Sequence, residues 1–180
     1  DAKLQLAIWD ISRDVVINAD VVSDSGNLTL DAGTDLVLNA SVVTGDAGTI
    51  YLTSGNDVSL SDSVTTLSGD ILVDAGADLT QAAAITSTDG DVGLIAGGSL
   101  AQASGGDITT GGDVLLESGN GWTMAGDAEI TATGDVVGQA LGGDIELGVI
   151  GGTTVALSAS GSILDSNSGS QNVTSDHLSL

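Results

Sequence analysis

Aspartates recur at a nearly constant spacing through the middle of the chain. Each follows a glycine and precedes an apolar residue, and the steps between them are 21, 22 and 22 residues. The members are Asp70, Asp91, Asp113 and Asp135. Carboxylate oxygens are the ligands that calcium prefers. A stack of these side chains is therefore a candidate ladder for divalent cations, and calcium is the cofactor that it would imply.

The same aspartates also have a structural interpretation, because Asp and Asn at corners accept hydrogen bonds from backbone N–H groups. Asn27 and Thr49 precede the row at equivalent positions. A second, broken row of aspartates follows the same spacing: Asp35, Asp57, Asp78 and Asp144. Stacked like charges repel by about 1 kcal/mol in water, so such rows need cations or N–H donors beside them. Both interpretations stay open.

Groups that could catalyse a reaction on a polysaccharide are few. A lyase needs a cation to stabilise developing negative charge, and the cationic side chains are Lys3 and Arg13. A hydrolase needs two carboxylates in different environments, whereas the carboxylates here recur with the spacing. His177, the single histidine, is interpreted as a turn residue. We expect no catalytic residues and no enzyme, and a carbohydrate-active protein is the less favoured alternative.

A row of threonines raises the alternative of ice binding, because flat threonine arrays can order water. Each threonine follows the third apolar position of its repeat unit, and the row consists of Thr65, Thr86, Thr109 and Thr131. Threonine is β-branched and suits exposed strand positions in any case. We therefore interpret the row as strand surface.

Two glutamines and two large side chains occupy positions that are aliphatic elsewhere. Gln81 and Gln102 are expected to stack as an internal amide ladder that satisfies its own hydrogen bonds. Trp122 and Met124 are expected to fill the core one repeat later.

Charge and composition exclude several classes of function. The net charge is −23, with only two Lys and Arg residues, so a nucleic-acid partner is not expected. No apolar run of about 18 residues is present, so membrane insertion is not expected either. Hydrophobic residues make up 41% of the chain and 27 residues are glycine, which favours many short strands over disorder. With no cysteine, the fold must depend on backbone pairing and apolar packing.

A repeat sets the positions of all these residues. Its unit is a glycine, a small polar residue and then an apolar-x-apolar segment, and the steps between its glycines are 22, 21, 21, 22 and 22 residues. The anchor glycines are Gly26, Gly48, Gly69, Gly90, Gly112 and Gly134. Two further apolar positions complete each unit. The second is Leu36, Val58, Leu79, Leu100 and Trp122, and the third is Val42, Val64, Ile85, Ile108 and Ile130.

Three short segments per unit predict three strands and three turns per coil. The fold class is therefore all-β, a right-handed parallel β-helix of triangular section, with about 21–22 residues per coil and about eight coils. Residues 1–180 are expected to form this one solenoid. An antiparallel sandwich also has short strands, but it does not explain the constant spacing.

The pattern extends toward both ends of the chain. Leu6 and Ile8 fit an earlier unit, and Val155 fits a later one. The spacing becomes irregular from Gly142 to Gly152, which predicts a remodelled corner. Solenoids need polar caps, and neither end has one, so we expect a segment of a longer repetitive protein or a subunit that stacks end to end.

The repeated motif resembles the repeats of filamentous-haemagglutinin-like exoproteins. These are large bacterial surface proteins of the two-partner-secretion type. The matching runs have a Gly-[Asp/Asn]-apolar-x-apolar strand followed by a small residue, a glycine and a second strand, and they are Gly26–Leu38, Gly69–Leu79 and Gly112–Trp122. The resemblance implies an extracellular, cell-surface stalk or filament segment with a structural or adhesive role. Its partners would be further copies, end to end or side by side, or the surface of a host or neighbouring cell.

Overall fold

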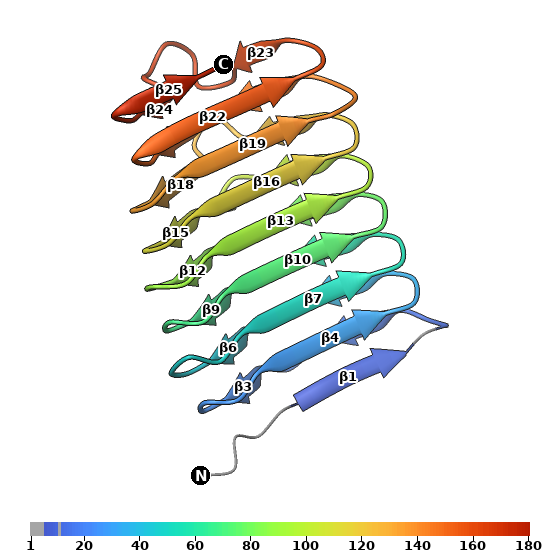
Figure 1. The fold of residues 1–180 in the computed structure, drawn as a ribbon. Coiled ribbons are helices and arrows are strands. Elements are labelled where there is room, and N and C mark those ends of the chain that lie inside the picture. The colour runs from blue at the N-terminus through green and yellow to red at the C-terminus, as the bar shows by residue number, and fades with distance from the viewer. Residues whose placement is uncertain (1–5, 11) are drawn as a thin grey trace.

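The computed structural model describes residues 6–10 and 12–180. These residues form three parallel sheets that wind into a triangular solenoid of about eight coils (Figure 1). The strands that face the viewer in Figure 1 run from left to right while the chain climbs from the N-terminal coil to the C-terminal coil, so the solenoid is right-handed. The predicted fold class is confirmed.

Each coil contributes one strand to each sheet. Sheet A has β1 (Leu6–Asp10), β4 (Leu28–Ala32), β7 (Ile50–Ser54), β10 (Ile71–Ala75), β13 (Val92–Ala96), β16 (Val114–Ser118), β19 (Val136–Ala140), β22 (Thr154–Ala159) and β25 (His177–Ser179). Sheet B has β2 (Val15–Ile17), β5 (Leu36–Leu38), β8 (Val58–Leu60), β11 (Leu79–Gln81), β14 (Leu100–Gln102), β17 (Trp122–Met124), β20 (Ile145–Leu147) and β23 (Ile163–Asp165). Sheet C has β3 (Val21–Ser23), β6 (Val42–Thr44), β9 (Val64–Thr66), β12 (Ile85–Ser87), β15 (Ile108–Thr110), β18 (Glu129–Ala132), β21 (Val149–Gly151) and β24 (Val173–Thr174).

The register between coils follows the repeat in the sequence. In sheet A, Ile71 pairs with Ile50 of the preceding coil and with Val92 of the following coil. Sheets B and C keep the same offsets, so Leu79 pairs with Leu100 and Ile85 pairs with Ile108. Each residue of the repeat therefore stacks on its own equivalents, about 4.8 Å apart.

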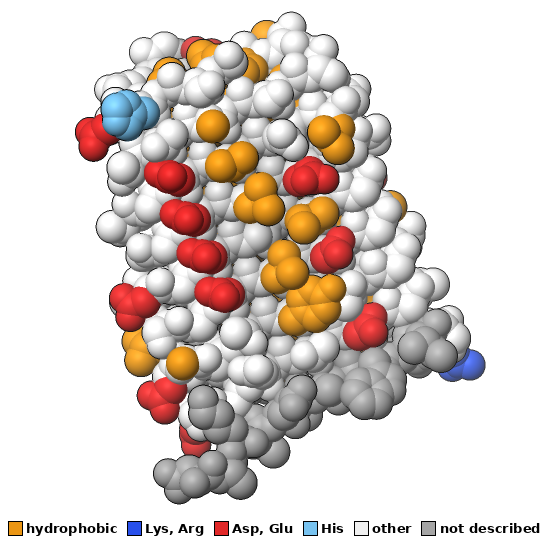
Figure 2. Space-filling view, viewed as in Figure 1, with side chains coloured by type: hydrophobic (Ala, Val, Ile, Leu, Met, Phe, Trp, Pro, Cys, Tyr) orange, Lys and Arg blue, Asp and Glu red, His pale blue; other side chains and the backbone are white. Residues whose placement is uncertain are grey.

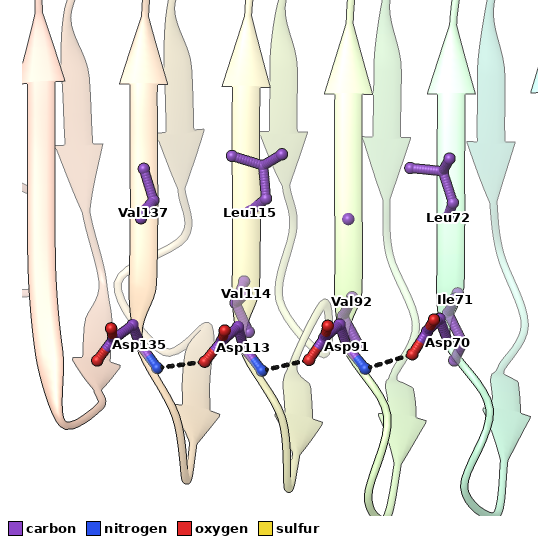
Figure 3. Close-up of a pocket in the computed structure, with 11 residues that line it drawn as sticks. Asp70, Ile71, Leu72, Asp91, Val92, Asp113, Val114, Leu115, Asp135 and Val137 are labelled. Atoms are coloured by element: carbon purple, nitrogen blue, oxygen red, sulfur yellow. Dashed lines mark hydrogen bonds between the residues drawn. The ribbon is translucent and has the colours of Figure 1, made fainter.

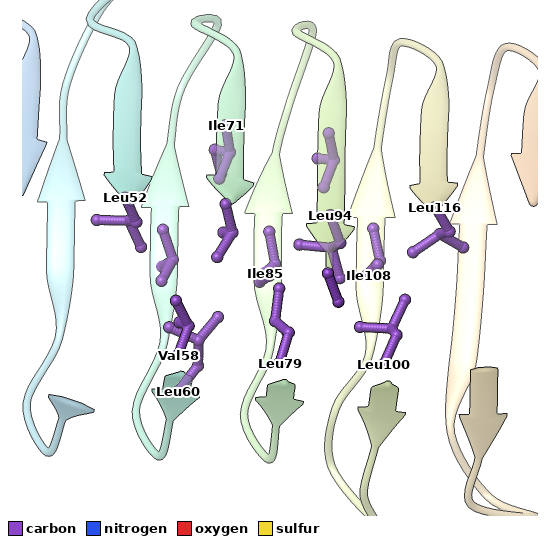
Figure 4. Close-up of a cluster of buried hydrophobic side chains, with 14 of the residues drawn as sticks. Leu52, Val58, Leu60, Ile71, Leu79, Ile85, Leu94, Leu100, Ile108 and Leu116 are labelled. Carbon is purple, nitrogen blue, oxygen red and sulfur yellow. The ribbon is translucent and has the colours of Figure 1, made fainter. Parts of the chain in front are cut away.

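The core fills the inside of the triangle. Side chains alternate between buried and more exposed along most of the strands, as in β10, where Ile71, Val73 and Ala75 are buried. Figure 4 shows aliphatic side chains from all three sheets meeting inside consecutive coils. Burying one such side chain contributes about 1.5–3 kcal/mol, and the repeat multiplies that contribution along the axis.

The predicted remodelled corner lies between β20 and β21, where Gly148 alone separates the two strands. A Cβ atom at Gly148 would lie 2.5 Å from the carbonyl oxygen of Ala128, so the tight corner requires glycine. The coil is also short overall, because Val136 pairs with Val155 only 19 residues later.

The next coil is longer and covers this short corner. Its loop, residues 166–172, joins β23 to β24. The Ser166 hydroxyl lies 2.7 Å from the carbonyl oxygen of Leu147 and 2.9 Å from that of Met124, two coils below. The Asn172 amide donates to the carbonyl oxygen of Gly148 at 3.0 Å. An insertion in one coil thus supplies the donors that the shortened coil beneath it needs.

No helix with the length and apolar character to cross a bilayer occurs in the part of the chain that the structure describes.

Candidate functional site

The four predicted aspartates stack at one corner of the solenoid, each directly before a strand of sheet A (Figure 3). All four are exposed. The Oδ1 atom of Asp70 accepts a hydrogen bond from the backbone N–H of Asp91 at 2.9 Å. Asp91 accepts in the same way from Asp113, and Asp113 from Asp135, at 2.8 Å each. The carboxylates therefore satisfy the backbone donors of the next coil, as the structural interpretation requires.

The second row of aspartates does the same at the corner before sheet B. Asp57 donates its backbone N–H to Asp35 at 3.2 Å, and Asp78 donates to Asp57 at 3.0 Å. Asp144 lies in this column too, because the residues that follow it and Gly121 pair in register, and its carboxylate accepts from the N–H of Ser162. One device thus recurs at two corners: an Asp before a strand accepts the N–H of its counterpart one coil on.

Calcium binding at the Asp70–Asp135 row stays a prediction. Among the described residues, no three or more His, Cys, Asp or Glu side chains come together in a way that would hold a metal ion. Thermal unfolding measured by circular dichroism, with and without millimolar calcium, tests the prediction. A large rise in melting temperature that the Asp91→Asn, Asp113→Asn variant loses would establish it, since Asn keeps the N–H acceptor and removes the charge.

A column of mostly apolar side chains runs parallel to the aspartate row on the outer face of sheet A. Its members pair in register from coil to coil: Tyr51, Leu72, Gly93, Leu115 and Val137. Between this column and the aspartates lies an open groove that crosses four strands, from Asp70 and Leu72 to Asp135 and Val137. Figure 2 shows the red aspartate row and the orange apolar side chains beside it on one face. Sequence analysis missed this groove, although the outward positions were readable from the alternation.

The predicted amide ladder is present and extends to the tryptophan. Gln102 donates from Nε2 to Oε1 of Gln81 at 3.1 Å, and Oε1 of Gln102 accepts from Nε1 of Trp122 at 3.0 Å. All three side chains are buried, and Met124 is buried beside them. This network is internal and offers no surface to a ligand.

A second buried polar ladder was not predicted. A buried Ser or Thr ends each of five sheet C strands, β3, β6, β9, β12 and β15, and its hydroxyl bonds to backbone at an adjacent corner. The Thr66 hydroxyl donates to the carbonyl oxygen of Gly48 at 2.8 Å and accepts from the N–H of Gly69 at 3.2 Å. Ser87 makes the same two contacts with Gly69 and Gly90. The signal in the sequence was a hydroxyl residue two to four positions before each anchor glycine from Gly26 to Gly112.

The remaining candidate residues lie apart from one another. The row of threonines forms a single column on the outside of sheet C, as expected, with Thr86 paired to Thr65 and to Thr109. His177 is exposed at the first position of β25, opposite Thr154, and so lies in a strand and not in a turn. Arg13 is exposed beside β2, and Lys3 lies outside the described residues.

Comparisons with protein-family models, with curated proteins and with solved structures found no match to this chain. The β-solenoid repeat itself is evident from the structure.

Proposed function

We propose that this chain is a structural or adhesive segment of a stalk or filament on a bacterial cell surface, from the repeat region of a filamentous-haemagglutinin-like exoprotein. The observation that carries the proposal is the continuous register of three parallel sheets through about eight coils. Each coil buries its apolar side against the next, so the chain is a rod whose length grows with the number of repeats. The family, the extracellular location and the surface habitat in this proposal are based on the resemblance of the sequence motif.

The acidic surface fits this role. A net charge of −23 keeps neighbouring rods apart unless cations screen it. Partners in the proposal are further copies, end to end or side by side, or the surface of a host or neighbouring cell. The proposal includes no catalysis, and release of products from acidic polysaccharides by the purified chain would contradict that part.

Antibodies raised against the chain test the location. On the bacterium that produces the protein, labelling of intact cells is expected to equal labelling of permeabilised cells. Labelling that needs permeabilisation would overturn the proposal. Force spectroscopy tests the mechanical part: the chain, pulled from both ends, is expected to resist as a rod and to unfold in steps of one or a few coils.

A further inference from the structure

The outer face of sheet A carries an apolar column between two acidic columns. The central column, Tyr51 to Val137, has exposed side chains at Leu115 and Val137, with exposed fractions of 42% and 39%. The first acidic column is the Asp70–Asp135 row, two residues before the apolar column along each strand. The second lies two residues after it, where Asp31, Asp74 and Glu117 occupy alternate coils in one register. Both flanks of the apolar column are therefore negative (Figure 2).

We infer that this face docks a basic amphipathic α-helix of a partner protein, laid along the solenoid axis. Its apolar stripe would cover the central column, and its Lys or Arg side chains would reach the acidic columns on either side. The inference concerns a binding surface and stands independently of the proposed surface role.

The charge of this face determines the charge that the partner must have. The carboxylates of both columns attract cations and repel acidic surfaces. A second copy of this chain does not fit, because the whole sequence has only two Lys and Arg residues and a net charge of −23. The partner must therefore bring the basic side chains.

Width favours a helix as the bound element. Asp70, directly before β10, and Asp74, within it, are four residues apart, and Asp113 and Glu117 are related to β16 in the same way. At about 3.3 Å per residue, the acidic columns are about 13 Å apart. An α-helix with its side chains is about 10–12 Å across, so one helix fills the space between them.

The axial repeat favours the same occupant. Equivalent groups recur about every 4.8 Å along the solenoid, and a helix presents one face about every 5.4 Å. In an extended peptide, side chains on the same face are about 6.6 Å apart. This spacing differs more from that of the coils, so the side chains lose register with them. Tyr51 and Val137 are four coil steps apart, which gives about 19 Å and matches a helix of about 13 residues.

The notch at Gly93 supports a knob from the partner. Gly93 stands between Leu72 and Leu115 in the column, and a Cβ atom there would meet only the Cδ1 atom of Leu72, at 2.9 Å. A leucine side chain of the helix can enter at this point once the flexible end of the Leu72 side chain shifts aside.

The test uses two leucine–lysine peptides of the same composition, each of about 16 residues. One has its leucines at helical spacing and the other alternates leucine with lysine. Isothermal titration calorimetry with the full chain is expected to show binding of the helical peptide that weakens with added salt. The alternating peptide is expected to bind at least about tenfold more weakly. Equal affinity for the two, or no binding of the helical one, would overturn the inference.

Variants separate this face from general attraction to an acidic protein. Leu115→Ser with Val137→Ser removes exposed apolar groups, and Asp113→Asn with Asp135→Asn removes two charges while keeping the N–H acceptors. Each pair is expected to lower the affinity for the helical peptide by about tenfold.

The matched control is Asp35→Asn with Asp57→Asn, which removes the same charge and keeps the same type of hydrogen bond at the sheet B corner. It is expected to change the affinity by less than about twofold. A loss in the control pair equal to that in the Asp113 and Asp135 pair would show general charge attraction only and would contradict the assigned face.

Discussion

The coils built on β4 to β12 and those built on β16 to β24 share one backbone design but differ in how they fill their interiors. In the first region, aliphatic side chains stack on near copies of themselves, as Leu38 does on Leu60. In the second, each unusual residue fits one particular partner in the adjacent coil. Gly138 stands where Leu116 and Leu157 stand in neighbouring coils.

Trp122 explains the missing side chain at Gly138. A Cβ atom at Gly138 would lie 2.5 Å from the Cζ3 atom of the Trp122 ring. The indole therefore occupies the volume that a leucine at 138 would take. Repetition makes packing partners interchangeable in one region, whereas the other region depends on matched pairs, so single substitutions are expected to cost more there.

The largest effect is expected for this pair. Trp122→Leu leaves a cavity and removes the donor to Gln102, which is expected to lower the free energy of unfolding by about 3 kcal/mol. Gly138→Leu overpacks the same space at a cost of about 2–3 kcal/mol. The double variant is expected to lose less unfolding free energy than the two single losses added together. The difference should be at least about 1 kcal/mol, as measured by urea unfolding.

Gly93→Leu is the control for that cycle. It adds the same side chain to sheet A but on the outer face, and it is expected to change stability by less than about 0.5 kcal/mol. Strict additivity of Trp122→Leu and Gly138→Leu would show that the two residues do not share one space.

The next effect concerns the buried amide network. Gln102→Leu restores the aliphatic column of the earlier coils but leaves Nε1 of Trp122 and Oε1 of Gln81 without the partners they have now. The expected loss is about 2 kcal/mol. The indole N–H resonance of Trp122 should shift at the same time, and an unchanged resonance would contradict the assigned hydrogen bond.

A smaller effect is expected in the regular region. Thr66→Val keeps the shape of the side chain but removes the hydroxyl that joins Gly48 and Gly69. The expected cost is about 1–2 kcal/mol in urea unfolding. Thr65→Val, one residue away on the outer face, is the matched control and is expected to stay within about 0.5 kcal/mol. Equal effects would mean that the hydroxyl ladder does not stabilise the corner.

The smallest effect is expected at the loop that covers the short corner. The backbone N–H of Asn167 and the side-chain amide of Asn172 hold the pKa of Asp165 below its ordinary value of 3.8. A lowered pKa in the folded state means that the carboxylate stabilises the loop fully above about pH 4 and loses this effect as the pH falls below it.

Hydrogen exchange of residues 167–172 measures that effect. Protection is expected to fall on acidification below about pH 4, while the Asp165→Asn variant should show less protection at neutral pH and little further change with acid. Protection that is independent of pH in the parent chain would contradict the role of Asp165.

Much of the fold could be predicted from the sequence because every coil of a solenoid repeats the same local sequence pattern. The spacing of Gly26, Gly48 and Gly69 gave the coil length, and the alternation around Leu28 and Leu30 gave the buried face. The register then followed, since a slip of one residue would turn each buried face toward solvent.

The candidate site was harder to predict. The aspartate rows were visible, but their two interpretations differ only in what the carboxylates contact. The hydrogen bond from the N–H of Asp91 to Asp70 depends on the turn geometry between coils. The groove depends on the Asp70–Asp135 row and the apolar column lying side by side, which follows only when 21- and 22-residue coils stack in register.

The sequence by itself determined the class of fold, the repeat and the composition of each column, because these depend on periodicity and on residue type alone. Only the tertiary structure decided which of the residues that depart from the repeat contact one another. Trp122 and Gly138 are 16 residues apart and on different sheets, and Gly148 and the loop 166–172 belong to different coils. The physical reason is that side-chain packing and the hydrogen bonding of donors depend on neighbours in space. The repeat period does not specify which residue will contact one that departs from the repeat.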